Sequence, residues 1–232
     1  MKLSIIIPAY NEDSSLEKVV EKVYEVELGE IEKEIIISND GSRDRTGEII
    51  RELQRKYPGL VSYSSPINLG KGAAVRLGMA ISTGDIITIQ DADMELDPGE
   101  YPRLLSPLID RKSVVVYGSR FLHSNIKLNR KSRMANRFLT FLTNVLFNAH
   151  LTDMETAYKM FFRETLNGIR LRCVRFDFEP EITASFLKKG YKIIEVPISY
   201  TPRTVIAGKK ISWVDGFEAI YTLIRCRFFT RV

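Results

Sequence analysis

Two carboxylates separated by one residue, Asp91 and Asp93, come directly after a short hydrophobic run. Where the backbone leaves the edge of a sheet, side chains at this spacing can both turn toward one hard cation. Mg²⁺ is usually held through one or two carboxylates together with substrate phosphate oxygens, and Mn²⁺ favours the same oxygen ligands. Glu95 would add a third oxygen ligand. The spacing therefore predicts a divalent-metal site, although such pairs also occur in acidic turns that bind nothing.

Two further segments follow hydrophobic runs in the same way. Asp40, in Asp40-Gly41-Ser42, could accept hydrogen bonds from a nucleobase or a ribose, or could close a turn of its own backbone, and the sequence leaves both open. The segment Gly70-Lys71-Gly72 belongs to neither a P-loop nor a complete dinucleotide fingerprint. We expect it to start a helix close to the sheet, with Lys71 available to a phosphate.

Charge is distributed unevenly along the chain. Residues 1–110 contain 12 lysines and arginines against 20 acids, whereas residues 111–232 contain 22 against 9. No acid occurs from Arg111 to Thr152, a stretch that includes Arg120 and, at helical spacings, Arg130, Arg133 and Arg137. Because arginine forks bind phosphate oxygens, the stretch predicts an anionic partner: a phosphate ligand, an anionic membrane surface or a nucleic acid. The alternative is a solvated basic surface, which is the interpretation we favour for Arg130 and Arg137. Asp153, which ends the stretch, is a candidate for a charged role in a site.

The elements that must position these residues are read from the hydrophobic pattern. Short β-branched runs alternate with amphipathic helical segments, which predicts an α/β fold with a mostly parallel sheet and helices on both faces. Ligands of such sheets bind at the carboxyl ends of the strands, where the segments 8–13, 39–44, 68–72 and 91–95 would meet. The predicted strands are 3–7, 34–38, 61–64, 85–90, 113–117, 158–162 and 192–197; the predicted helices are 15–27, 46–56, 71–81, 180–188 and 213–229.

Composition sets the outer limits. With 232 residues, 44% hydrophobic and 27% charged, the chain is expected to form one domain, 1–232, with a carboxyl-terminal amphipathic helix. The two cysteines have no metal or redox spacing, which indicates a reducing compartment. We expect no signal peptide and no membrane-spanning helix. The apolar stripe that starts at Phe138 suits a core, or a membrane interface beside the basic cluster.

Taken together, the motifs resemble family 2 glycosyltransferases of the GT-A fold, a Rossmann-like α/β architecture. More narrowly, the chain resembles dolichol-phosphate mannose synthases and related polyprenyl-phosphate glycosyltransferases. The resemblance covers nearly the whole chain. It is carried by Ile5-Ile6-Ile7-Pro8-Ala9-Tyr10-Asn11-Glu12, Asn39-Asp40-Gly41-Ser42, Asn68-Leu69-Gly70-Lys71-Gly72, Asp91-Ala92-Asp93, Gly118-Ser119-Arg120-Phe121, Asp153-Met154-Glu155-Thr156 and Glu195-Val196-Pro197.

The resemblance implies a role for each matched residue. Residues 1–110 would bind a nucleotide sugar and residues 111–232 its acceptor. The implied donor-binding residues are Pro8, Tyr10, Glu12, Asp40, Asp91, Ala92 and Lys209, and the metal ligands are Asp91, Asp93 and Glu95. The acceptor phosphate would contact Arg120, Arg133 and Lys210, and the implied catalytic residues are Asp93, Asp153 and Arg203.

The implied activity is a Mn²⁺- or Mg²⁺-dependent, inverting transfer of a sugar to a polyprenyl or dolichyl phosphate. Mannose from GDP-mannose is favoured by the resemblance alone. The enzyme would act peripherally at the cytoplasmic face of a membrane and would bind no nucleic acid. A UDP-sugar donor stays open, as does a sugar hydroxyl acceptor with Asp153 or Glu155 as the base. The alternative outside enzymes is a basic α/β protein that binds nucleic acid.

Overall fold

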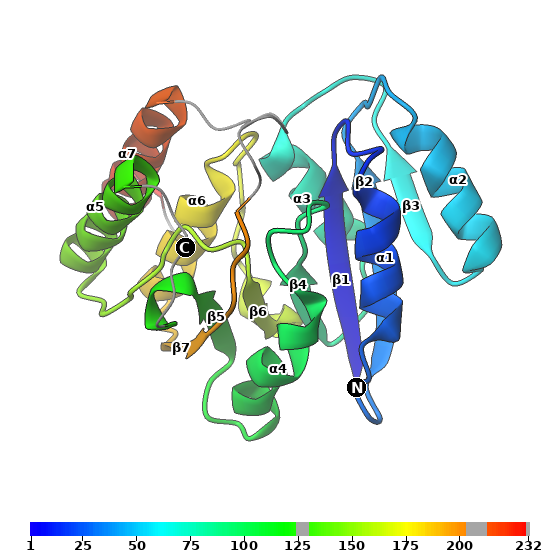
Figure 1. Ribbon diagram of the computed structural model, residues 1–232. Coiled ribbons are helices and arrows are strands. Elements are labelled where there is room, and N and C mark those ends of the chain that lie inside the picture. The colour runs from blue at the N-terminus through cyan, green and yellow to red at the C-terminus, as the bar shows by residue number, and fades with distance from the viewer. Residues whose placement is uncertain (124–129, 203–212, 231–232) are drawn as a thin grey trace.

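The computed structural model describes residues 1–123, 130–202 and 213–230, and its centre is a seven-stranded sheet in the order β3-β2-β1-β4-β6-β5-β7 (Figure 1). The strands are β1 (Lys2–Ala9), β2 (Glu32–Asn39), β3 (Val61–Ser64), β4 (Ile86–Ile89), β5 (Val115–Ser119), β6 (Lys159–Phe162) and β7 (Ile193–Pro197). The helices are α1 (Leu16–Glu25), α2 (Thr46–Lys56), α3 (Lys71–Ile81), α4 (Tyr101–Ile109), α5 (Arg130–Phe147), α6 (Phe178–Lys188) and α7 (Trp213–Phe228). Three short 3₁₀ segments are η1 (Pro98–Glu100), η2 (Arg120–Leu122) and η3 (Arg163–Leu166).

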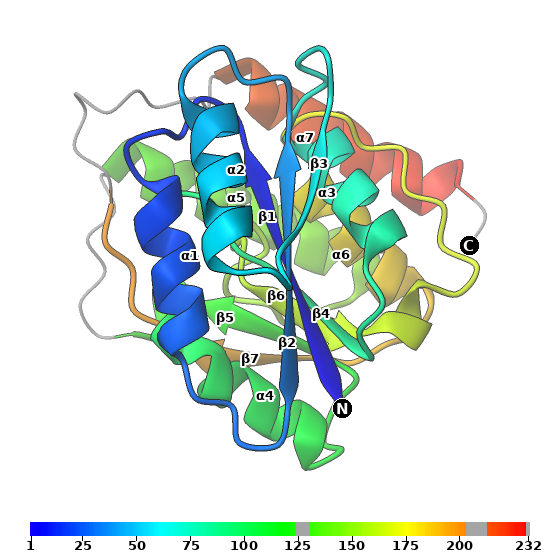
Figure 2. The ribbon, with the colours of Figure 1, turned by 90° about the vertical axis from the view of Figure 1, so that its right-hand side faces the viewer.

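Strand alternation distributes the core over both faces of the sheet. In β1, Ile5 and Ile7 join one buried cluster and Ile6 joins another, because successive side chains point to opposite faces. Helices α1, α2 and α4 pack on the first face, and α3 and α6 pack on the second. Figure 2 shows α1 and α2 on one side of the sheet and α3 and α6 on the other. The predicted α/β sheet with helices on both faces is confirmed.

The strand order puts a switch point between β1 and β4. From β1 the chain first builds outward through β2 and β3, and then β4 pairs with β1 on its other side, all in parallel. Antiparallel β6 lies between β4 and β5, which is why the sheet is mostly and not wholly parallel. Open α/β sheets bind ligands outside the carboxyl ends of their strands at such a switch point.

Helices α5 and α7 form an outer layer at one end of the molecule. Both pack on α6 through a third buried cluster that includes Leu139, Ala184, Ala219 and Leu223. They lie side by side in Figure 1 and contact each other. Among the described residues, none of the helices combines the length and the apolar character needed to cross a bilayer.

Candidate active site

Hydrogen bonds join the loops that follow β1 and β2. Asn11 has a positive φ of 52° and donates its backbone N–H to Ser42 Oγ at 3.0 Å, while its side-chain Oδ1 accepts from the backbone N–H of Arg43 at 2.9 Å. The backbone N–H of Glu12 donates to Thr46 Oγ1 at 2.9 Å. Pro8, near the end of β1, and Tyr10, in the loop that follows, are half-buried, and Glu12 is buried. Two of the segments predicted to meet at the sheet edge are therefore in contact.

Asp40 binds the loop that precedes α3. Its buried carboxylate accepts the backbone N–H groups of Leu69 and Gly70, each at 2.7 Å. A Cβ on Gly41 would lie 2.4 Å from the backbone of Ile67, so this close approach requires glycine. Of the two interpretations the sequence left open, a base or ribose contact and a backbone role, the structure displays the backbone role. The contact to a nucleotide stays a prediction.

The expectation that Lys71 is available to a phosphate is not met in this structure. Its Nζ lies 2.8 Å from Asp91 Oδ1 and 2.8 Å from Glu179 Oε1. Burial alone would lower the pKa of Lys71, but the two carboxylates outweigh it and raise the pKa above its usual value. The backbone N–H groups of Gly72 and Ala73 also bind the carbonyls of Arg175 and Val174. The 173–175 loop therefore covers the start of α3. The two segments can approach this closely because residue 72 is glycine: a Cβ there would lie 2.9 Å from the carbonyl oxygen of Arg175.

Asp91, Asp93 and Glu95 follow β4 at the switch point. The preceding residue, Gln90, is fixed by the hydroxyls of two buried tyrosines, Tyr101 and Tyr158, which both donate to its Oε1 at 2.7 Å. Asp93 Oδ1 accepts from the backbone N–H of Glu95 at 3.1 Å. The Asp-x-Asp segment therefore leaves a rigid strand end and turns over the carboxyl edge of the sheet.

The three predicted metal ligands do not converge as a set in this structure. Asp91 turns to Lys71, and Glu95 Oε2 accepts the hydroxyl of Tyr200 at 2.8 Å. Within the described residues, no three histidine, cysteine, aspartate or glutamate side chains are arranged to hold a metal ion. Asp91 and Asp93 do offer the oxygen ligands that Mg²⁺ and Mn²⁺ favour, and a site of that kind takes its remaining ligands from substrate phosphates and water. Asp91 and Asp93 therefore fit the two-carboxylate form of such a site, and the metal-binding role of Glu95 stays a prediction.

Arg120 and Asp153 form a buried ion pair at the end of β5. Arg120 Nε and Nη2 donate to the two oxygens of Asp153 at 2.7 and 2.8 Å, and the backbone N–H of Arg120 donates at 3.0 Å. The Asp153 side chain is fully buried and that of Arg120 is 11% exposed. The Arg120 guanidinium also lies over the ring of Tyr200, 5.4 Å from its centroid. The structure thus pairs Arg120, a predicted phosphate ligand, with Asp153, a predicted catalytic residue. Both carboxylate oxygens of Asp153 accept hydrogen bonds from Arg120.

Glu195, to which the sequence assigned no role, holds the segment that carries Asp153. Its Oε2 accepts the backbone N–H and the hydroxyl of Thr152 at 2.7 and 2.9 Å, and its Oε1 accepts the backbone N–H of Asp153 at 2.9 Å. The hydroxyls of Thr152 and Ser119 lie 2.6 Å apart. Because these partners are more than 30 residues apart in the chain, no local spacing could have revealed them.

A second group of buried charges lies beyond Asp153. Burial and the nearby carboxylate of Glu179 raise the pKa of Glu155 to about 7. Its Oε1 is inaccessible to solvent and has no hydrogen-bond partner. Burial lowers the pKa of Lys159 to about 8, and its ammonium donates to the carbonyls of Met154 and Thr156. The segment 153–159 therefore presents a carboxylate that changes charge near neutral pH.

The remaining predicted residues divide into two groups. Arg133, on α5, is half-buried and its Nε has no hydrogen-bond partner; Ala92 is buried behind the Asp-x-Asp turn. Arg203, Lys209 and Lys210 lie outside the described residues, so their predicted roles remain predictions.

Known proteins resemble this chain in fold and in sequence. The fold is that of GT-A glycosyltransferases: the glucosyl-3-phosphoglycerate synthase of Mycobacterium tuberculosis, solved with UDP, superposes with a TM-score of 0.76 at 19% identity, over 99% of this chain and 81% of that one. The sequence matches the family model for glycosyl transferase family 2 over residues 4–170. The chain belongs to that family.

Relatives of known name narrow the comparison. A dolichyl-phosphate beta-glucosyltransferase of Trichomonas vaginalis is 29% identical over 99% of this chain and 74% of its own length. A dolichol-phosphate mannosyltransferase of Pyrococcus furiosus is 28% identical over 97% of this chain and 64% of its own length. Their names specify one acceptor class and two different sugars.

Proposed function

We propose that the chain transfers a hexose from a nucleoside diphosphate sugar to a polyprenyl phosphate of the dolichyl type. The observation that carries the proposal is the position of Asp91 and Asp93 at the switch point between β1 and β4, beside the loops that follow β1 and β2. Family membership supports sugar transfer, and the relatives' names support the acceptor. We propose UDP-glucose and GDP-mannose as alternative donors.

The donor diphosphate would lie at the carboxyl edge, near Asp91 and Asp93. These two carboxylates would hold Mn²⁺ or Mg²⁺, which neutralises the charge that develops on a departing diphosphate. The same metals occur with UDP in structures of the Mycobacterium tuberculosis synthase. The rigid strand end set by Gln90 supports this role, because a preorganised charge stabilises a transition state without reorganising.

A phosphate acceptor explains why Asp153 need not be a base. A phosphate monoester has its second pKa at about 6, so at neutral pH it already carries the charge with which it attacks the sugar. The enzyme then needs cations to hold two anionic groups together. Arg133 carries an unpartnered Nε, and the surrounding stretch has no acid. We infer that Arg133 contacts the acceptor phosphate and that Asp153 acts by positioning Arg120.

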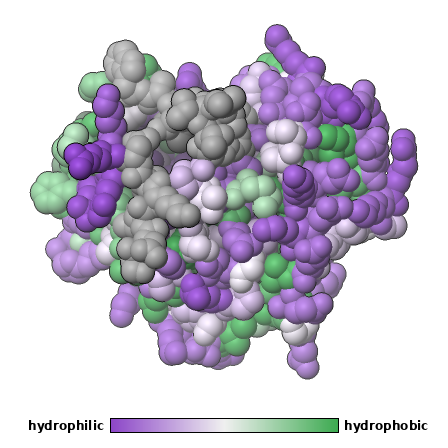
Figure 3. Space-filling model, in the orientation of Figure 1, coloured by the Kyte–Doolittle hydropathy of each residue, from purple (hydrophilic) through white to green (hydrophobic). Residues whose placement is uncertain are grey.

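The outer faces of α5 and α7 support action at a membrane surface. On α5, Met134, Phe138, Phe141 and Val145 are 54–72% exposed, and on α7, Phe217, Tyr221, Ile224 and Phe228 are 40–66% exposed. Both sets repeat at intervals of four, three and four residues, which places each on one helix face. Figure 3 shows apolar groups at the edge of the molecule where these two helices lie. Arg130 and Arg137 border the α5 stripe, which favours an anionic bilayer as the partner.

The test is transfer of radiolabel to an organic phase. The protein is incubated with Mn²⁺, dolichyl phosphate and either labelled UDP-glucose or labelled GDP-mannose. Transfer from one donor establishes the activity and identifies the sugar. Asp93→Asn should lower turnover by about 100-fold or more, whereas Asp110→Asn, on an exposed carboxylate paired with Lys112, should leave it unchanged. Wild-type turnover in Asp93→Asn would contradict the assignment of the metal site.

A sugar hydroxyl acceptor is the second candidate, and Glu155 favours it. A hydroxyl needs a base, and a carboxylate with a pKa near 7 is suited to that task. Asp153 is a poorer candidate because Arg120 occupies both of its oxygens. Loss of transfer by Glu155→Gln by about 100-fold or more, together with transfer to a neutral glycan, would select this reaction. Retention of transfer to dolichyl phosphate in Glu155→Gln supports the first proposal.

A further inference from the structure

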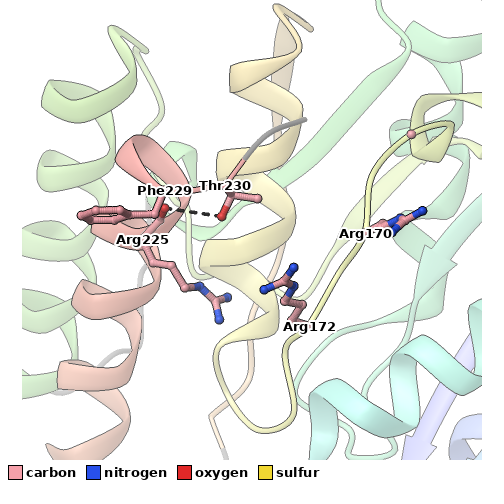
Figure 4. Close-up of a pocket in the computed structure, with 6 residues that line it drawn as sticks. Arg170, Arg172, Arg225, Phe229 and Thr230 are labelled. Atoms are coloured by element: carbon pink, nitrogen blue, oxygen red, sulfur yellow. Dashed lines mark hydrogen bonds between the residues drawn. The ribbon is translucent and has the colours of Figure 1, made fainter.

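A pocket lined by arginines lies beside the end of α7, and its lining, among the residues that the structure describes, includes none of the predicted donor, metal or acceptor residues. Its volume is about 620 Å³, and it is lined by Gly168, Arg170, Arg172, Arg225, Phe229 and Thr230. Arg172 and Arg225 extend toward each other across it, from the 167–177 loop and from α7, while Arg170 points aside at its margin (Figure 4). Within the described residues, the lining contains three guanidinium groups and no acidic side chain.

One buried carboxylate fixes both walls of this pocket. Glu181, on α6, is 3% exposed, and its Oε1 lies 2.6 Å from Arg225 Nη2. Its Oε2 accepts the backbone N–H groups of Arg172 and Cys173 at 2.7 and 2.6 Å. Glu181 therefore fixes the guanidinium of Arg225 and the backbone of Arg172. Because Arg225 is already ordered, an anion that binds it pays a smaller entropy cost.

The charges in the pocket are only partly compensated. Glu181 balances Arg225, but within the described residues neither Arg170 nor Arg172 forms an ion pair, and both are exposed. Arg225 Nε has no hydrogen-bond partner. Two lysines add to the positive charge: Lys188 donates to the carbonyl of Thr230, and Lys189 donates to the carbonyl of Asn167, next to Gly168. Guanidinium groups in this arrangement match the oxygens of a phosphate, which they bind in a fork.

We propose that the pocket formed by Arg172 and Arg225, with Arg170 at its margin, is a second anion site that binds a phosphate group separate from the phosphates of donor and acceptor. Phe229, which is 81% exposed, lines the pocket, and the exposed Phe228 precedes it. The phosphate therefore comes either from a lipid headgroup, with the phenyl rings in the apolar layer, or from a phosphate in solution. The proposal does not depend on which sugar is transferred or on the acceptor.

The test uses a double variant, Arg170→Gln with Arg172→Gln, in the full chain. Arg225 is retained because its removal would leave Glu181 buried without its cation. The matched control is Arg51→Gln with Arg55→Gln, which removes the same charge from two exposed residues of α2, on the opposite side of the molecule. Nucleotide-sugar binding by each variant shows that its fold and its active site are intact.

Two measurements distinguish the sources. The first is the rise in melting temperature caused by inorganic phosphate, and the second is flotation with phosphatidylcholine vesicles with and without phosphatidic acid. A loss of about tenfold in affinity for phosphatidic acid vesicles, in the pocket variant alone, identifies a headgroup site. Loss of the phosphate-induced stabilisation alone identifies a site for phosphate in solution. If the pocket variant and the α2 control behave alike in both measurements, the proposal is wrong.

Discussion

The buried pair of Arg120 and Asp153 is a positioning device whose geometry depends on the shape of guanidinium. Three hydrogen bonds converge on one carboxylate that has no access to solvent. Arg120→Lys retains the charge but loses the planar fork, so one Asp153 oxygen loses its side-chain donor. We expect the free energy of unfolding in urea to fall by about 1–3 kcal/mol.

The matched control for this substitution is Arg45→Lys. Arg45 also pairs with a carboxylate, that of Glu48, but the two side chains are 72% and 56% exposed. Exposed pairs contribute little, so the change should be below about 0.5 kcal/mol. Equal losses in the two variants would mean that burial of the Arg120 pair adds nothing to its strength.

Glu155 makes stability depend on pH in a defined direction. Its pKa is raised from 4.5 to about 7, first by burial and then by Glu179, so ionisation is costlier in the folded chain than in the unfolded one. Protonated Glu155 makes its full contribution to the free energy of unfolding below pH 4.5, and this contribution is lost as the pH rises through 7. Glu155→Gln imitates the protonated form. It should match the wild type near pH 5 and exceed it at pH 8 by about 1–3 kcal/mol.

The measurement is the melting temperature of both proteins at several pH values, beside Glu27→Gln on an exposed carboxylate. The Glu27 variant controls for the loss of one acidic charge from the chain. The pKa of Lys159 is lowered to about 8, so this residue lowers the free energy of unfolding as the pH falls from 10.5 through 8. The two proteins are therefore compared at pH 8 and below, where most of this change is complete. A Glu155 variant that gains nothing between pH 5 and pH 8 would contradict the raised pKa.

At the scale of elements, the start of α3 depends on Gly70. Its φ is +105°, and a Cβ there would lie 2.4 Å from the carbonyl oxygen of Val174. Gly70→Ala therefore combines backbone strain with a collision against a second segment of main chain. We expect a loss of about 2 kcal/mol or more in the free energy of unfolding.

Gly59→Ala is the control for Gly70→Ala. Gly59 has an ordinary φ, and a Cβ added there would have no neighbouring atom within 4 Å, so the change should stay within about 0.5 kcal/mol. Gly70→Ala should also weaken nucleotide-sugar binding, because Asp40 accepts the backbone N–H of residue 70. Unchanged stability in Gly70→Ala would show that the 173–175 loop yields at little cost.

Elements with strong local periodicity could be predicted from the sequence. The helices α2 and α3 and the strand β3 begin and end at the predicted residues, because their hydrophobic spacing and flanking residues agree. Helix α4 was not predicted: Pro102 and Pro107 interrupt its pattern, and tertiary burial of Leu104 and Leu108 sustains it. The order of the strands also required the structure, since it is set by packing between distant segments.

The candidate site was predictable where the chemistry is local. Asp91 and Asp93 were found because two carboxylates follow one strand. The partners of Lys71 and Arg120 could not be found in that way, because Glu179 is 108 residues from the first and Asp153 is 33 residues from the second. The sequence predicted Lys71 and Arg120 as phosphate ligands, whereas in the structure each forms an ion pair with a distant carboxylate.

At the scale of the whole molecule, α6 connects the two charged regions. Glu179 binds Lys71 and through it Asp91, while Glu181 binds Arg225 in the arginine pocket. Both carboxylates belong to the first turn of α6, where the helix dipole favours negative charge. The active-site edge and the arginine pocket therefore share one rigid support.

The apolar outer face of α5 and α7 yields a prediction about the molecule as a whole. Phe141→Ser with Phe217→Ser removes two exposed rings from this face without disturbing the core. Because each ring would bury apolar area in a bilayer, binding to anionic vesicles should fall at least about tenfold, while the melting temperature stays nearly unchanged. Val61→Ser with Ile109→Ser, two exposed residues outside these two helices, should bind vesicles as the wild type does.

Salt separates the two contributions to vesicle binding. Raising the ionic strength should weaken binding of the wild type, because Arg130 and Arg137 act through screened charge. The doubly substituted protein should retain the same salt dependence at a lower affinity, since its basic residues are intact. If the phenylalanine variant binds vesicles as tightly as the control, then this face does not meet the membrane, and the lipid acceptor must reach the site from another side. If raising the ionic strength leaves vesicle binding by the wild type unchanged, an anionic surface is not the partner.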